Sequence, residues 1–271
     1  MPRDVNQWNY NPSIMKGNLL ALLFATLWLA CGSDDESIFG IEPALASYND
    51  DAPALKKTYC GDSDCKTLSS EDRYTYDSQG KLSRIENFGR AAGGSWIPYQ
   101  YSEFVYAPSG MLVSKTEYIK NNQNGWVRYT ETEFEYEAGL LKVERSYNFP
   151  NSSGTKMPVR STSYDYANGK KSGQRWYDVE GKLMYRVEYR YKNDVLSHET
   201  WYDASNKANR TFEHKFSGNR RQIGEYLTAS RELLAMIEKS YDDQGRLLTQ
   251  ETKVNNPLLC ALPPGKIQFT Y

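Results

Sequence analysis

The sequence contains few histidines and has almost no net charge. Its 271 residues include only two His, and 33 Lys and Arg balance 34 Asp and Glu. A net charge near zero gives no general electrostatic attraction toward nucleic acid. His198 and His214 lie apart in strand-like segments, so the paired ligand spacing of structural zinc sites is missing. We therefore expect no nucleic-acid partner, no metal and no other cofactor.

The sequence also lacks the short motifs of common enzyme classes. Gly-x-Ser-x-Gly, His-Glu-x-x-His and the glycine-rich phosphate loop do not occur. Asp and Glu are plentiful, but they fall in expected turns and on the charged face of expected strands, where solvated surface is their ordinary place. We therefore expect a protein that is not an enzyme.

Aromatic residues are abundant. The chain has 22 Tyr and 6 Trp within a strongly hydrophilic average composition. Such a composition suits half-buried β-strands better than an aliphatic helical core. The composition predicts an all-β protein.

The N-terminal region contains one apolar run, Leu19 to Ala30, preceded by Lys16 and followed by Cys31. The run is shorter than the roughly 20 residues that a membrane-spanning helix needs, and it fits the core of a signal peptide. The segment before it lacks the compact basic character of a signal start, so Met15 is an alternative initiator. We expect residues 1–31 to be a signal peptide.

The end of this run resembles the lipobox of bacterial lipoproteins. The resemblance rests on Ala30 and Cys31, with Leu27 and Leu29 just before them. It implies that Cys31 is lipidated, becomes the mature N-terminus and anchors the protein to the membrane by acyl chains, without spanning it. The alternative is an ordinary signal peptide with an incidental cysteine.

The acidic residues after Cys31 add a second resemblance. Gly32-Ser-Asp-Asp-Glu36 is similar to the surface-export signal of Bacteroidetes lipoproteins. It implies a lipid-anchored protein of the bacterial outer membrane, exposed at the cell surface. Residues 32–57 are acidic, contain proline and show little apolar periodicity, so we expect a flexible tether there.

Three cysteines remain once Cys31 is assigned to lipid. An envelope compartment permits disulfides, so Cys60 and Cys65 could close a small loop and leave Cys260 free. A bridge from either of them to Cys260 would instead join the first and last parts of the folded region. The sequence leaves both pairings open.

The rest of the chain, residues 58–271, is repetitive. Aromatic anchors recur first every 30 residues and then every 25, and a second series recurs every 25. The first series is Tyr76, Tyr106, Tyr136, Tyr166, Tyr191, Phe216 and Tyr241, and the second is Tyr177, Tyr202 and Leu227. Several anchors precede an Asp-x-x-Gly or Asp-x-x-Asn turn, which closes a hairpin. Each unit therefore predicts two strands and two reversals.

The recurring Tyr-Asp-x-x-Gly-Lys/Arg-Leu resembles the YD, or RHS-type, repeat of bacterial envelope proteins and toxin shells. The best matches are Tyr76–Leu82, Tyr177–Leu183 and Tyr241–Leu247. The resemblance implies a continuous β-hairpin sheet, and carbohydrate binding is proposed for some members. We expect a repetitive antiparallel β-hairpin meander forming a strongly twisted or curled sheet, because strand twist accumulates and the apolar face needs cover.

Two functions from different classes remain. A binding or scaffold module would use exposed aromatic rings to hold glycan or protein ligands. Longer loops are expected around residues 93–98, 121–125 and 150–158, and Trp96 and Trp126 are the best candidates because they flank the first two. The alternative is an envelope chaperone or immunity-type partner protein that covers a partner's apolar surface. Exposed tryptophans near the loops would favour the first function, and a groove of unfilled aromatic residues would favour the second.

Overall fold

The described part of the protein consists of strands and short turns. A computed structural model describes residues 53–59, 68–91, 93–121, 123–150, 154–255 and 265–271, all within one compact unit, Pro43–Tyr271. No helix among these residues is long and apolar enough to cross a membrane. The strands are β1 (Leu55–Tyr59), β2 (Leu68–Tyr76), β3 (Leu82–Arg90), β4 (Trp96–Tyr106), β5 (Leu112–Lys120), β6 (Trp126–Glu137), β7 (Leu140–Asn148), β8 (Met157–Ala167), β9 (Lys170–Tyr177), β10 (Leu183–Lys192), β11 (Val195–Asp203), β12 (Ala208–Ser217), β13 (Arg220–Leu227), β14 (Leu233–Tyr241), β15 (Leu247–Val254) and β16 (Gly265–Thr270).

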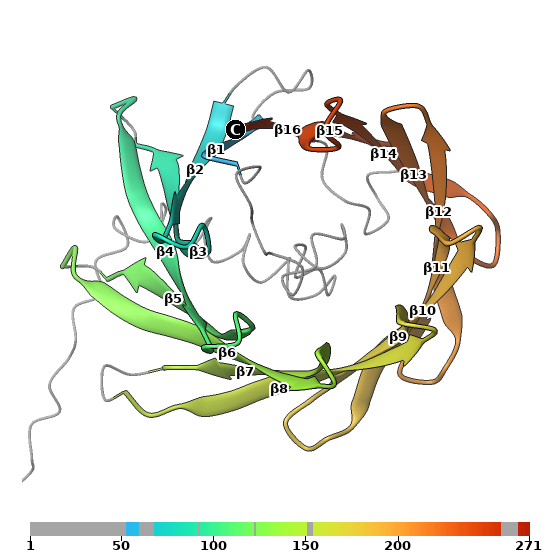
Figure 1. Cartoon of the computed structure of the whole chain (residues 1–271), viewed down its shortest axis with the longest axis horizontal. Coiled ribbons are helices and arrows are strands. Elements are labelled where there is room, and N and C mark those ends of the chain that lie inside the picture. Colours follow the sequence, from blue (N-terminus) through green and yellow to red (C-terminus); the bar gives the residue numbers. More distant parts are fainter. Residues whose placement is uncertain (1–52, 60–67, 92, 122, 151–153, 256–264) are drawn as a thin grey trace, which may run out of the picture. The chain divides into compact units, whose positions relative to one another are not determined.

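These sixteen strands form one closed antiparallel barrel. Each strand pairs with its neighbours in the sequence, and β1 pairs with β16 to close the ring, as Figure 1 shows. The expected all-β hairpin meander is confirmed, and closure takes the place of a merely curled sheet. Closure leaves no unpaired edge in the ring. β1 begins at Leu55, within the last residues of the expected tether.

One kind of turn uses the repeated aspartate as expected. Asp77 Oδ1 accepts hydrogen bonds from the backbone N–H groups of Gln79 and Lys81 at 2.8 and 2.9 Å. Gly80 has φ of 75°, a conformation that glycine adopts without strain. The same arrangement recurs at the turns that begin with Asn121, Asp178, Asp203 and Asp242.

The other kind of turn has two residues with positive φ. Ala138 and Gly139 have φ of 51° and 79°, and Asn168 and Gly169 have φ of 53° and 74°. Two consecutive positive φ values are typical of the type I′ turn, whose twist matches that of the flanking strands. Short turns of both kinds explain why neighbours in the sequence are neighbours in the barrel.

The repeated tyrosines join one hairpin to the next. The Tyr191 hydroxyl donates to the carbonyl of Lys171 at 3.0 Å, and the Tyr76 hydroxyl donates to the carbonyl of Pro53 at 2.8 Å. Other anchors pack in a row against a buried cluster; these are Tyr106, Tyr136 and Tyr166, and the cluster is Leu112, Phe134, Leu141 and Tyr164. The anchor position is thus repeated because each copy contacts its neighbour.

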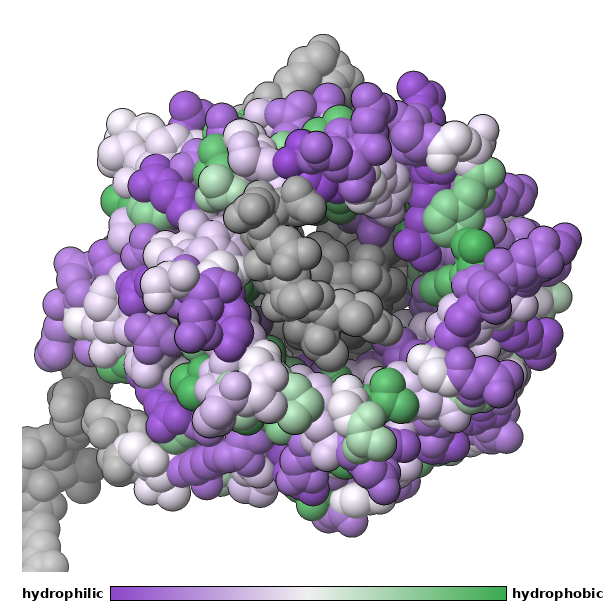
Figure 2. Space-filling view, viewed as in Figure 1, coloured by the Kyte–Doolittle hydropathy of each residue, from purple (hydrophilic) through white to green (hydrophobic). Residues whose placement is uncertain are grey.

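The barrel has an inner and an outer face of different character. Val187 lies opposite Gln174, and Ile223 lies opposite Ile237; all four are among the side chains less than 2 % exposed. The strand register places both pairs on the same face, which we call the inner face. The outer face carries many charged side chains, and hydrophilic residues predominate around the outside of the ring in Figure 2.

The five extra residues of the longer repeats are divided between strands and connections, and each long hairpin contains a bulge. Tyr99, Tyr129 and Val159 are bulged residues without a partner in the register, one in each long hairpin. Beyond the bulges at Tyr99 and Tyr129 the hairpins continue to tight turns, such as the one where the Ala91 N–H donates to the Ser95 carbonyl. The connections at 91–95 and 121–125 are no longer than the turns at 77–81 and 107–111, so the long loops expected around residues 93–98 and 121–125 are wrong. The third expected loop, around residues 150–158, corresponds to the longer connection between β7 and β8, which lies partly outside the described residues.

Candidate functional site

The outer face of β3 to β6 carries a group of contacting aromatic rings. Tyr101 on β4 stacks on Tyr118 of β5, with ring centroids 4.5 Å apart and planes 14° apart. Trp126 on β6 meets Tyr101 edge-on, with centroids 4.7 Å apart. The Arg84 guanidinium on β3 covers Tyr101, 3.7 Å from its centroid. We call Arg84, Tyr101, Tyr118 and Trp126 the aromatic surface.

The strand register assembles the aromatic surface. Tyr101 and Tyr118 are directly opposite each other in the pairing of β4 with β5. Cross-strand aromatic pairs of this kind favour offset-stacked or edge-on contacts. The group therefore presents ring faces and edges on adjoining strands, and 36 % of Trp126 is exposed to solvent.

The two predicted binding tryptophans do not form one site. Trp96 on β4 lies opposite Arg90, and Trp126 on β6 lies opposite Lys120, each beside its own hairpin turn. The cations lie 5.9 and 5.3 Å from the respective ring centroids. β5 separates the two strands, and the ring beside Trp126 belongs to Tyr101. Trp96 is only partly exposed.

Charges around the aromatic surface are locally paired. Arg84 forms ion pairs with Glu86 and with Glu103, each at 3.1 Å. Burial, followed by the negative charge of Glu103, raises the pKa of Tyr101 above its ordinary value. The Tyr101 hydroxyl is therefore a neutral hydrogen-bonding group at physiological pH.

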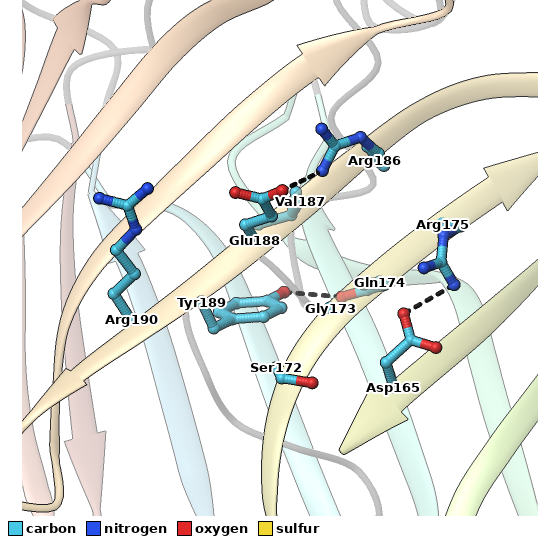
Figure 3. A pocket seen from close by; sticks show the side chains of 10 residues that line it. All are labelled: Asp165, Ser172, Gly173, Gln174, Arg175, Arg186, Val187, Glu188, Tyr189 and Arg190. Atoms are coloured by element: carbon cyan, nitrogen blue, oxygen red, sulfur yellow. Dashed lines mark hydrogen bonds and ion pairs between the residues drawn. The ribbon is translucent and has the colours of Figure 1, made fainter. Parts of the chain in front are cut away.

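A polar depression of about 470 Å³ opens on the outer face between β8, β9 and β10. Figure 3 shows its floor at Gly173, with Asp165 and Arg175 on one side and Arg186, Glu188 and Arg190 along β10. Its lining contains more arginines than carboxylates.

The inner face contains a buried cluster of charged groups. His214 Nε2 lies 2.9 Å from a Glu199 carboxylate oxygen, and its Nδ1 lies 2.7 Å from a guanidinium nitrogen of Arg221. Because a guanidinium only donates, Nδ1 is the acceptor of this hydrogen bond. Lys239, 3 % exposed, lies opposite Arg221. Burial and then the charge of Arg221 lower the pKa of Lys239 to about 7, although Glu199 opposes them.

A second inner-face group is a chain of hydrogen bonds across β7 to β10. The Tyr189 hydroxyl donates to Gln174 at 2.8 Å, and the Gln174 amide donates to the Tyr164 hydroxyl at 3.3 Å. Tyr164 in turn donates to a Glu144 carboxylate oxygen at 2.7 Å. Burial raises the pKa of Glu144 above its ordinary value. Each polar side chain of this chain has a partner, which is how a buried polar group avoids a large desolvation cost.

These inner groups correct the expectation that carboxylates lie only on the solvated face. Glu199 and Glu225 are buried, and Glu225 is 1 % exposed and ion-paired with Arg210. The signal was present in the alternation, because Glu199 shares the parity of Trp201, and Lys239 shares that of Ile237. Charged residues at apolar positions of a strand mark inward-facing polar groups.

Several predicted residues lie outside the described part of the chain. Cys31, the predicted lipidation site, and Cys60, Cys65 and Cys260, the candidates for a disulfide, belong to this group. Within the described ranges, no group of three or more His, Cys, Asp or Glu side chains is arranged to hold a metal ion.

No protein-family model and no curated protein matches the chain. Among solved structures, a porin-like protein from Bacteroides vulgatus ATCC 8482 is 11 % identical and aligns over 81 % of this chain and 98 % of its own, with a TM-score of 0.45. A porin-like protein from Bacteroides uniformis ATCC 8492 is 8 % identical over 80 % and 96 % of the two chains, with a TM-score of 0.38. The TcdB2-TccC3 structure is 10 % identical over 79 % of this chain and 17 % of its own, with a TM-score of 0.20.

Proposed function

We propose that this protein is a cell-envelope lipoprotein of the YD/RHS-repeat type whose barrel is a non-catalytic module that binds glycans on the aromatic surface. The observation that carries the proposal is the contact of a partly exposed Trp126 with the stacked pair of Tyr101 and Tyr118. Binding of a protein ligand by the same rings, or a scaffold role based on them, would also be a non-catalytic binding function.

The chemistry of the aromatic surface suits a sugar. Ring faces and edges at the surface offer apolar contact, while hydroxyl groups of a ligand need donors and acceptors close by. Glu103, which is ion-paired with Arg84, and the neutral Tyr101 hydroxyl supply them. A rigid β-scaffold holds these side chains in place, which reduces the entropy lost on binding.

The charges on the outer face favour a barrel that is surrounded by water and anchored to the membrane by lipid. Ion pairs such as Arg186 with Glu188 and Arg175 with Asp165 lie on this face, on neighbouring strands. Charged side chains on the lipid-facing side of a membrane barrel are costly. We therefore place the barrel beside the outer membrane, held by acyl chains on Cys31, and at the cell surface on the strength of the acidic residues that follow.

The binding function is tested with an array of purified neutral and acidic oligosaccharides. We expect the wild-type protein to retain at least one class of glycan and the Trp126→Ala variant to lose it, because the stacking ring is removed. Phe216→Ala is the matched control, since Phe216 is also an exposed ring beside a cation, 5.1 Å from Arg221, but lies on β12. Equal binding by the wild type and Trp126→Ala, or no binding at all, would contradict the proposal.

The location is tested by protease shaving of intact cells that express the native protein, with a periplasmic marker as control. Digestion of the barrel with the marker intact supports a surface position, and protection overturns it. The Cys31→Ala variant should move from the detergent phase to the aqueous phase in Triton X-114 partitioning. Unchanged partitioning would exclude the lipid anchor at Cys31.

A second candidate function, an envelope chaperone or immunity-type partner protein, is favoured by apolar residues near the tips of the long hairpins. Ile97 is 48 % exposed and Met157 is 51 % exposed. Such residues suit contact with a partner's apolar surface. Suppression of the aggregation of reduced lysozyme by the wild type, and its loss in Ile97→Ser with glycan binding unchanged, would establish this function beside or instead of the first.

A further inference from the structure

The depression on the outer face exists because β9 has a glycine at Gly173. A Cβ placed there would lie 2.8 Å from an Asp165 carboxylate oxygen, closer than side chains tolerate. The peptide backbone of β9 therefore forms an open floor between the side chains of β8 and β10. The volume of about 470 Å³ falls within the range of small-ligand pockets.

Two carboxylates flank this floor symmetrically. Asp165 on β8 and Glu188 on β10 are the residues opposite Gly173 on its two sides. Asp165 is held by Arg175 at 2.6 Å, and Glu188 is held by Arg186 at 2.5 Å. Each carboxylate is thereby held in place, with lone pairs left to accept further hydrogen bonds.

The two arginines that hold the carboxylates are themselves engaged. Arg175 and Arg186 are directly opposite each other, an arrangement of like charges that the paired carboxylates offset. Arg186 also donates to Asn206 at 2.7 Å and stacks on Tyr202, 3.7 Å from the ring centroid. These contacts make them part of the wall.

Arg190 differs from the other two arginines. It lies on β10 two positions beyond Glu188, on the same face, and its side chain is exposed. Figure 3 shows it at the end of the depression, pointing to the same side of β10 as Glu188 and Arg186. Among the described residues, no carboxylate forms an ion pair with it. The lining therefore holds a planar cation available to an incoming anion, beside two oriented acceptors.

We propose that the depression over Gly173 is a binding subsite for a sugar acid, a hexuronate unit whose carboxylate pairs with Arg190 and whose hydroxyl groups donate to Asp165 and Glu188. A carboxylate matches the guanidinium fork, and vicinal hydroxyls match two fixed carboxylates facing one another across a glycine. A simple anion would be repelled by Asp165 and Glu188, and a neutral sugar would leave Arg190 without its partner. The subsite lies on β8 to β10 and does not require the aromatic surface.

Isothermal titration of the full folded protein with trigalacturonate at low ionic strength tests the subsite. We expect saturable binding that is at least tenfold tighter than binding of galactotriose, its neutral counterpart. Arg190→Gln should weaken trigalacturonate binding about tenfold or more, in line with the loss of a charge-assisted hydrogen bond. Gly173→Ala should weaken it by filling the floor and displacing Asp165.

The matched control is Arg220→Gln, which removes another exposed outer-face charge, on β13, and should change the affinity less than twofold. Equal losses in Arg190→Gln and Arg220→Gln would reduce the effect to general electrostatics and overturn the proposal. No binding of trigalacturonate, equal binding of galactotriose, or full competition by equimolar acetate would each overturn it as well.

The test of the subsite gives a result that is independent of the test of glycan binding at the aromatic surface. Trp126→Ala should bind trigalacturonate like the wild type, because Trp126 lies on β6, away from the depression. Loss of trigalacturonate binding in Trp126→Ala with no effect of Arg190→Gln would assign acidic sugars to the aromatic surface and refute the subsite. Circular dichroism of each variant checks that the β-structure is intact.

Discussion

At the scale of single residues, inward-facing charges carry a cost that depends on pH. Lys239 is buried and has a pKa of about 7, whereas an unfolded lysine has one of about 10.4. Between these values the unfolded chain holds a proton that the folded chain lacks. The free energy of unfolding contributed by Lys239 should therefore rise as the pH increases from about 7 to about 10. Below pH 7 both states are protonated, and the full cost of burying the charge remains.

Replacement of this lysine by an apolar side chain of similar length tests the effect. Lys239→Met should raise the free energy of unfolding at pH 6 by on the order of 3 kcal/mol, because no charge has to be desolvated. At pH 10 the difference from the wild type should be smaller. Urea unfolding of both proteins at the two pH values measures it, and a gain independent of pH would contradict the assigned cause.

Single residues also show where the sequence was sufficient and where it was not. Trp126 was singled out because it flanks an expected loop. The stacking of Tyr101 on Tyr118 depends on the register of β4 with β5 and could not be predicted from the sequence. The buried Lys239 broke the alternation, but its neighbours Arg221 and Glu199 come from other strands. The sequence identifies the residue types, but the register of the strands decides which side chains come into contact.

At the scale of elements, the turns were the most predictable feature because their chemistry is local. Asp178 supplies one carboxylate oxygen to the N–H groups of Glu180 and Lys182, at 3.1 and 2.8 Å. Gly181 follows with φ of 77°. All of these residues lie within one short stretch of sequence. The lengths of the hairpins were less predictable, because the bulges at Tyr99 and Tyr129 let pairing continue beyond them.

A single turn variant measures this local contribution. Asp178→Ala removes the acceptor of two backbone N–H groups and should lower the free energy of unfolding by about 1 to 2 kcal/mol. Asp178→Asn is the matched control and should lose less, since Asn121 accepts the same two bonds in its own turn. Chemical unfolding monitored by tryptophan fluorescence gives the comparison. An equal loss in the Asn and Ala variants would show that the charge, not the acceptor geometry, stabilises the turn.

At the scale of the whole barrel, closure was the feature that could not be predicted from the sequence. Each repeat specifies its pairing with the next repeat, but the meeting of β1 with β16 depends on the number, twist and tilt of all the strands. The pairing of β1 with β16, which we call the seam, is also short. β1 and β16 share five paired positions, whereas β10 and β11 share eight.

The short pairings of β16, with five positions shared with β1 and four with β15, predict that the barrel opens first in this region. Backbone amides of β1 and β16 should exchange with deuterium faster than those of β10 and β11, because fewer hydrogen bonds must break to free them. Native-state hydrogen exchange followed by mass spectrometry measures the difference. Slower exchange at the seam than at β10 and β11 would mean that side-chain contacts across β1 and β16 outweigh the shortness of the pairing.

The repeat also constrains how a barrel of this kind could change in size during evolution. Each 25-residue unit contributes two strands, so duplication or loss of one unit alters the circumference by two strands. An even strand number is preserved, and the first and last strands still meet antiparallel, as β1 and β16 do here. A gene encoding such units can therefore widen or narrow its product by whole repeats without redesigning the seam.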